Sequence, residues 1–117
     1  MDSQHGLKMQ EVSNAMVHIY KEHFGLGPTK VRSNYAGPDV IISSLADSLT
    51  PAEQKLVDMG EHQRLRDTRN FFQHATEQEF RESVEEITGR KVVAFVSGID
   101  TKEDMSSEVF YLQPTRD

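Results

Sequence analysis

The chain has 117 residues, a formal net charge of -6, 27% charged residues and no cysteine. This length suits a single domain over residues 1–117. The core of such a domain is small, so burial of further surface against a partner chain would add to its stability. The acidic balance argues against a nucleic-acid partner, because duplex binders need a basic footprint. The lack of thiols excludes disulfides, thiolate nucleophiles and cysteine-based zinc sites.

Nothing in the sequence predicts a membrane span. The longest wholly apolar run is "VVAFV" at residues 92–96, whereas a span needs about 20 apolar residues. The N-terminal "MDSQHGLKMQ" lacks the basic start and apolar stretch of a signal peptide. We therefore expect a soluble, cytoplasmic protein without direct membrane insertion, which would lie at the inner face of a membrane only through a partner.

Residues 3–24 predict an amphipathic helix. Met9, Val12, Met16 and Ile19 recur at steps of three and four, with Ala15 and Tyr20 beside them. This spacing places the six side chains on one face of the helix, which we expect to pack in the core.

The stretch "GLGPTKVR" at residues 25–32 raises the question of a phosphate-binding loop. A P-loop needs a strand, then GxxxxGK[ST], then a helix. Here the order is helix, glycines and strand, and there is no GK[ST] sequence. Gly25 and Gly27 are typical of a helix end, and Pro28 cannot continue a helix. We interpret the stretch as the end of a helix and the start of a strand.

Residues 29–36 and 39–45 predict two strands joined by a turn at "AGPD", and so a β-hairpin. Lys30, Arg32 and Asn34 are alternate residues of the first strand, so their side chains point to the same face of it. The two cations suit an anion, an acidic partner or a lipid headgroup. Two alternatives give these cations a structural role instead. They could lie on a solvated strand face, where charge discourages pairing with the edge of another sheet, or they could pair with acidic residues of a later helix. Those acidic residues are Glu77, Glu79, Glu82, Glu85 and Glu86.

"LTPAEQ" predicts a helix start, with Thr50 as N-cap, Pro51 in the first turn and Glu53 closing a capping box. The helical pattern continues to residue 88, where Gly89 ends it, and Gly60 would kink or split it. The apolar face expected in the core comprises Leu56, Val57, Leu65, Phe72, Ala75, Phe80, Val84 and Ile87.

Phe71 and Phe72 are adjacent on this helix and diverge by about 100°. One ring is expected on the sheet and the other on a second subunit, which favours a homodimer. The alternative is a wide buried stripe.

The chain ends with two further strands. "KVVAFVSG" at residues 91–98 predicts a strand buried on both faces, and "EVFYLQP" predicts a last strand that ends at Pro114. The order α-ββ-α-ββ predicts an α+β fold in which a four-stranded antiparallel sheet carries helices packed on one face.

No catalytic or metal-binding pattern emerges. Among five histidines, His18 and His23 do not share a helical face, and His62 and His74 lie too far apart to bind one ion. There is no GxSxG sequence, and the carboxylates are scattered over helix positions expected to be exposed. We predict a protein that is not an enzyme, with no catalytic residue, cofactor or metal.

Four stretches together resemble the MpsC family of small bacterial proteins, which is named for a sodium-translocating system that generates membrane potential. They are "SNAMVHIYKEHFGLGPTKVRS", "LTPAEQKLV", "FQHATEQEFRESVEEITGRKVVAFVSGID" and "EVFYLQP". The resemblance covers about residues 9–114, and its most specific pieces are "GPTK" with Arg32, "LTPAE" and "ITGRKV".

The resemblance implies an accessory protein of a membrane ion or bicarbonate transport system. It carries over no catalytic residue. Thr29, Lys30 and Arg32 are signature positions that could form a partner or ligand surface, with Arg69 and Arg90 as weaker candidates. The partners would be membrane transporter subunits. A second hypothesis is a sensor domain in which the same cations bind bicarbonate or a phosphate-bearing ligand.

Overall fold

The computed structural model describes residues 3–115 and contains three helices and four strands. In chain order these are α1 (Ser3–Phe24), β1 (Lys30–Tyr35), β2 (Val40–Ala46), α2 (Pro51–Asp58), α3 (His62–Thr88), β3 (Val92–Asp100) and β4 (Met105–Leu112). The predicted α+β class and the order α-ββ-α-ββ are confirmed, with the second helical segment divided in two.

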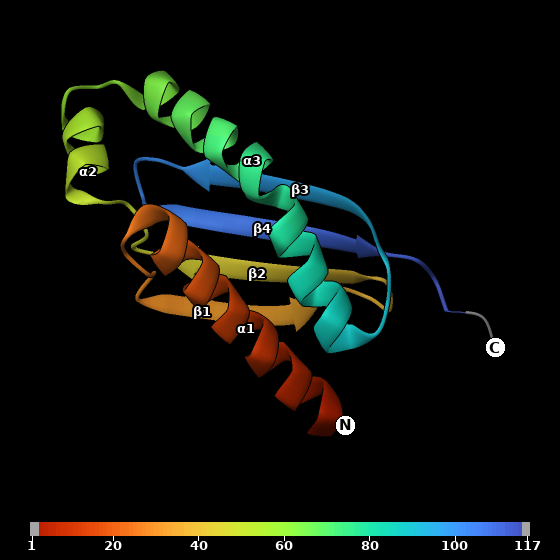
Figure 1. The fold of residues 1–117 in the computed structure, drawn as a ribbon. Coiled ribbons are helices and arrows are strands. Elements are labelled where there is room, and N and C mark those ends of the chain that lie inside the picture. The colour runs from red at the N-terminus through yellow and green to blue at the C-terminus, as the bar shows by residue number, and fades with distance from the viewer. Residues whose placement is uncertain (1–2, 116–117) are drawn as a thin grey trace.

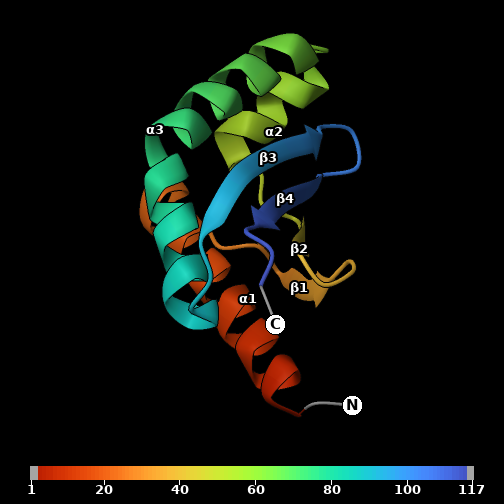
Figure 2. The same cartoon turned by 90° about the vertical axis from the view of Figure 1, so that its right-hand side faces the viewer.

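The four strands form one antiparallel sheet in the order β1-β2-β4-β3. Helices α1 and α3 lie side by side on one face of this sheet, and α2 lies beyond one end of it (Figure 1). The view turned by 90° shows that no described helix covers the opposite face (Figure 2). The fold therefore has two layers, and one face of its sheet is open.

The core lies between the two long helices and the sheet. The apolar face predicted for α1 is confirmed, because five of its six side chains are 0–8% exposed and the sixth, Ala15, is partly buried against them. Phe80 and Val84 of α3 pack against them, as do Ile41 of β2 and Phe110 of β4. Burial of such side chains supplies most of the stabilisation of a domain this small.

The helix break falls where the sequence predicts it. Thr50 and Glu53 form the expected capping box, and Pro51 begins α2. Gly60 has a φ of +76°, in the left-handed region that ends helices and favours glycine. The chain therefore splits into α2 and α3 at this residue.

The buried face of α3 differs from the prediction. Phe72 is 46% exposed and Ala75 is exposed, so placing them in the core was wrong. Arg69 and Gln73 are buried instead, at 1% and 6% exposed. The predicted stripe followed hydrophobicity alone, whereas these two polar side chains find hydrogen-bonding partners inside the fold.

Strand β3 was predicted to be buried on both faces, and this was wrong. It is an edge strand, because it pairs with β4 alone, and β4 pairs with β2 on its other side. Val93 is 52% exposed and Val96 is 55% exposed. The apolar run thus places valines on a surface that nothing in the described chain covers.

Candidate functional site

The open sheet face has an uncharged centre. Strands β2 and β4 are paired antiparallel in the middle of the sheet, and alternate side chains along each point away from the helices. On β2 these are Val40, Ile42, Ser44 and Ala46, and on β4 they are Met105, Ser107, Val109 and Tyr111. We call these eight residues the central patch. Its uncharged surface can contact another apolar surface without desolvating a charge.

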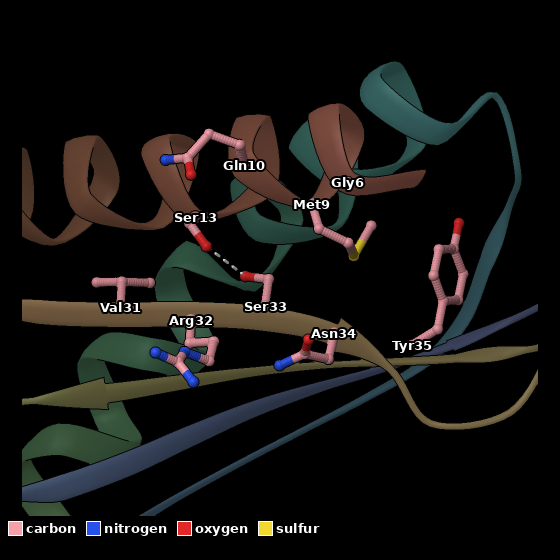
Figure 3. Close-up of a pocket in the computed structure, with 9 residues that line it drawn as sticks. All are labelled: Gly6, Met9, Gln10, Ser13, Val31, Arg32, Ser33, Asn34 and Tyr35. Atoms are coloured by element: carbon pink, nitrogen blue, oxygen red, sulfur yellow. Dashed lines mark hydrogen bonds between the residues drawn. The ribbon is translucent and has the colours of Figure 1, made fainter. Parts of the chain in front are cut away.

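Strand β1 lines one edge of this face with cations, as the sequence predicts. Lys30, Arg32 and Asn34 are exposed, whereas Ser33 between them is 6% exposed. Figure 3 shows Arg32 and Asn34 on the side of β1 turned away from α1, and Ser33 pointing toward Ser13 of that helix. The Ser13 and Ser33 Oγ atoms are 2.8 Å apart and hydrogen-bonded. We call Lys30 and Arg32 the cationic edge.

The cationic edge has no counter-charge within the described chain. Among residues 3–115 no salt bridge or side-chain hydrogen bond involves Lys30 or Arg32. The structure does not show the alternative, in which the cations pair with acidic residues of the long helix, because α3 packs on the opposite face (Figure 1). Two of those acids have other partners: Glu77 pairs with Arg81 and Glu79 with His23. Both cations are therefore available to a ligand or a partner.

Two hollows flank β1. One, of about 500 Å³, lies over the open face and is lined by the cationic edge together with Thr29, Ser44, Ala46 and Met105. The other, of about 700 Å³, lies between the first half of α1 and β1 and also contains Arg32 (Figure 3). Arg32 lines both hollows, and its side chain points away from α1, toward the open face (Figure 3).

Thr29, the remaining signature position, fixes the start of the strand. Its hydroxyl donates to an Asp47 carboxylate oxygen, and its backbone N–H donates to the Ala46 carbonyl at 3.1 Å. It lines the hollow over the open face but has its hydrogen-bonding partner within the chain.

The two weaker candidates lie away from this surface and are paired internally. Arg69 is 1% exposed and donates two hydrogen bonds to Glu53, at 2.6 and 2.7 Å, and one to the Ser48 carbonyl. Arg90 donates to the Asp39 carboxylate at 2.6 Å and to the carbonyl of Gln113. Both arginines therefore join elements of the fold, and we leave them out of the surface.

The structure contains a buried polar cluster that the sequence analysis did not predict. Glu108 of β4 is 0% exposed, and its Oε1 accepts from the Tyr20 hydroxyl and from Gln73 Nε2, the latter at 3.1 Å. The side-chain amide oxygen of Gln73, Oε1, accepts a hydrogen bond from Ser97 Oγ at 2.6 Å. Oε2 of Glu108 has no hydrogen-bonding partner among the described residues. We call Tyr20, Gln73, Ser97 and Glu108 the buried polar cluster.

The surroundings of this cluster favour neutral forms. Burial raises the pKa of Glu108 to about 7, and the contacts with Tyr20 and Ser97 and the charge of Arg69 offset only part of that rise. Burial, followed by the Glu108 carboxylate, holds the pKa of Tyr20 well above its ordinary value.

Outside this cluster, the carboxyl group of Glu53 stays ionised. Burial raises the pKa of Glu53, but hydrogen bonds from Arg69 and Thr50 outweigh the effect of burial and leave that pKa below its ordinary range.

Strand alternation was the signal that could have located Glu108. Ile41 and Phe110 face each other across β2 and β4 and are both buried. Phe110 and Leu112 mark the inward face of the last strand, so Glu108, two residues earlier, must also point inward. No such signal identifies Gln73 or Arg69, because a helix offers several positions at the border of its buried face.

One group of metal-ligand type occurs in the described part of the chain. Glu22, His23 and Glu79 each offer a ligand atom, all within 4.8 Å of one another. His23 Nε2 and Glu79 Oε1 lie 2.9 Å apart, as a hydrogen-bonded pair near the surface. That pair accounts for the grouping without an ion.

The comparisons with known proteins give one match. The model of the family described as "Na+-translocating membrane potential-generating system (MpsC)" matches residues 4–114. Neither the search of curated proteins nor the search of solved structures found a match. Across the described residues, no helix has both the length and the apolar character needed to cross a membrane.

Proposed function

The chain belongs to the MpsC family, and from that premise we propose that it is a non-enzymatic accessory or regulatory protein of a membrane transport system. The system would translocate sodium or bicarbonate, or generate membrane potential, through other, membrane-embedded subunits. The protein would be cytoplasmic and homodimeric, and would reach the inner face of the membrane by docking on those subunits.

One observation carries the docking proposal: the cationic edge has no counter-charge in the described chain and borders an uncovered face. Exposed charges that are left unpaired attract oppositely charged partners and speed their association. The docking partner would accordingly present acidic groups to Lys30 and Arg32.

Affinity capture tests this proposal. The tagged protein is incubated with detergent-solubilised native membranes, beside a Lys30→Glu, Arg32→Glu variant. We expect wild type to capture transporter subunits and the variant to lose them while keeping its fold, because reversed charges repel an acidic surface.

The matched control is Arg64→Glu with Arg66→Glu, which makes the same change in net charge at exposed positions of α3. Capture by this control should equal that by wild type. Equal capture by all three proteins would contradict the assignment of the cationic edge as the docking surface.

The second candidate function is a sensor for a small anion, and the hollow of about 500 Å³ beside Lys30 and Arg32 favours it. Bicarbonate or a phosphate-bearing ligand held there would stabilise the fold by roughly 2.7 kcal/mol at a hundredfold excess over its Kd. Thermal melting with a panel of anions measures this, with the same double reversal as control. Unchanged melting across the panel would contradict the sensor hypothesis.

A further inference from the structure

We propose that the open sheet face is the homodimer interface, and that two copies pack this face together about a two-fold axis parallel to the strands. The inference rests on the homodimer included in the proposed function and identifies the surface that forms it. It assigns Lys30 to the dimer, so docking on a membrane subunit would then rest on Arg32, whose row ends at Gly98 and meets no acidic residue of the second copy.

The composition of the face is that of an interface core with a charged rim. None of the eight residues of the central patch is charged. Met105 and Tyr111 are 48% and 42% exposed, and Val96 of the neighbouring strand is 55% exposed. Depletion of charge at the centre, with charges confined to the edges, distinguishes interface cores from ordinary surface. The rows Val40–Tyr111 and Ile42–Val109 form an apolar area next to Val96, and the row Ser44–Ser107 separates this area from Ala46 and Met105. An exposed apolar area on a small domain marks an interaction site.

The size of the face suits a small dimer. Four strands spaced about 4.8 Å apart and six to nine residues long give a flat footprint of about 450 Å². Side chains corrugate this face, so its accessible area exceeds the footprint. The smallest stable interfaces bury about 600 Å² on each partner. Nearly the whole face must therefore be covered.

The edges of the face carry opposite charges in one row. The register aligns Lys30 with Ala46, Ala46 with Met105, and Met105 with Asp100. Lys30 and Asp100 therefore lie at opposite edges of the same row, about 14 Å apart by three strand spacings. Asp100 Oδ1 accepts from the backbone N–H groups of Lys102 and Glu103, at 3.0 and 2.9 Å. Neither Lys30 nor Asp100 forms a salt bridge in the described chain.

A second copy can supply the missing counter-charges in only one of the two simple symmetric arrangements. An axis parallel to the strands places β1 over β3 of the partner, so each Lys30 faces the partner's edge that ends in Asp100. An axis across the strands places β1 over β1, which brings the two cationic edges to the same side and leaves Asp100 unmatched. Charge complementarity therefore selects the first arrangement, with sheets crossing at the usual angle of about 30°.

The alternative dimer surface is on α3, where the sequence predicts that one of the two adjacent phenylalanine rings contacts a second subunit. Phe71 is 71% exposed, and its ring packs edge-to-face against Phe72, which contacts Phe24 in turn. This surface offers two rings, whereas the sheet face offers a continuous patch over two strands. The two surfaces lie on different layers of the fold, so variants can test them separately.

Sedimentation equilibrium of the purified protein tests the interface. Wild type should have about twice the chain mass of 13.3 kDa. Val109→Lys places two like charges near the axis and should weaken the dimer at least a hundredfold. Phe71→Lys, the matched control, should leave it dimeric. Circular dichroism and melting of each variant check that the fold survives.

A charge exchange keeps the test valid if Val109→Lys fails to fold. Lys30→Asp should weaken the dimer at least tenfold, and adding Asp100→Lys should restore most of the loss, because the pair is re-formed with opposite signs. Restoration supports the axis parallel to the strands. A double variant weaker than both single variants would overturn that axis.

Monomeric wild type at about 100 µM, where any interface with a Kd near 1 µM is filled, would overturn the inference. Dissociation by Phe71→Lys with an intact Val109→Lys dimer would also overturn it, in favour of the helix surface. Membrane capture is scored separately: a monomer that still captures transporter subunits contradicts the sheet-face dimer alone. A sheet-face dimer that captures none contradicts docking alone.

Discussion

At the residue scale, Glu108 is the only carboxylate buried completely among the residues that the structure describes. Three elements present polar side chains to it: Tyr20 from α1, Arg69 and Gln73 from α3, and Ser97 from β3. With a pKa of about 7 in the fold and an ordinary value of 4.5, it is protonated in the folded state while the unfolded chain ionises it. Charge therefore develops inside the core as the pH rises through 7.

This predicts stability that declines with pH. The contribution of Glu108 is fully present below about pH 4.5 and is lost as the pH rises through 7, because the folded state then releases the extra proton. We expect the free energy of unfolding to fall by a few kcal/mol between pH 5 and pH 8. Urea denaturation at both pH values measures it. Glu108→Gln should abolish most of the decline, and the same decline in that variant would contradict the account.

Arg69 and Glu53 form the buried ion pair that joins α3 to the start of α2. Their side chains are 1% and 15% exposed and share two hydrogen bonds. Arg69→Met leaves the carboxylate partly buried without its partner and should cost about 3 kcal/mol. Glu53→Gln in the same chain should recover part of this loss, since glutamine also completes a capping box.

A double-mutant cycle in urea isolates the energy of this pair. Strictly additive effects of Arg69→Met and Glu53→Gln would show that the two side chains do not interact, and would contradict the structural assignment.

At the scale of elements, the left-handed Gly60 sets the end of α2. Its φ is +76°, and no atom lies within 4 Å of an added Cβ, so backbone strain alone penalises a larger residue. Gly60→Ala should cost about 1–2 kcal/mol. Gly6→Ala, inside α1 with equally open surroundings, should be neutral or stabilising. Thermal unfolding compares them; a stabilised Gly60→Ala variant would mean that α2 and α3 fuse into one helix.

The elements themselves were largely predictable because local signals specify them. Hydrophobic periodicity, the Thr50 capping box and Gly89 mark α1, α2 and the end of α3. The edge position of β3 was not predictable, since a strand rich in valine reads the same whether it is buried or lies on an uncovered face. Strand order depends on tertiary pairing, which local sequence does not encode.

The candidate site was predictable in part for the same reason. Alternation along β1 placed Lys30 and Arg32 together on one face, and the structure confirms that arrangement. The environment of each cation was not predictable: Arg69 finds a buried carboxylate from α2, and Arg90 a carboxylate from the β1–β2 turn. Only the fold separates paired arginines from available ones.

At the scale of the whole molecule, one arrangement links the fold to the proposals. All described helices lie on one face or beyond one end of the sheet, and the uncovered face combines the central patch with the cationic edge (Figures 1 and 2). The exposed valines of β3, anomalous for an isolated chain, fit a face that another protein covers. We therefore propose that this protein makes its contacts through the open side of its sheet.

Site-specific photo-crosslinking in the native cell tests this claim most directly. A benzophenone amino acid replaces Ser107, exposed in the middle of the open face, or Ala75, exposed on α3. We predict adducts with a second copy or with membrane subunits from position 107, and none from position 75. Adducts from position 75 alone would contradict the claim and place the interaction surface on the helices.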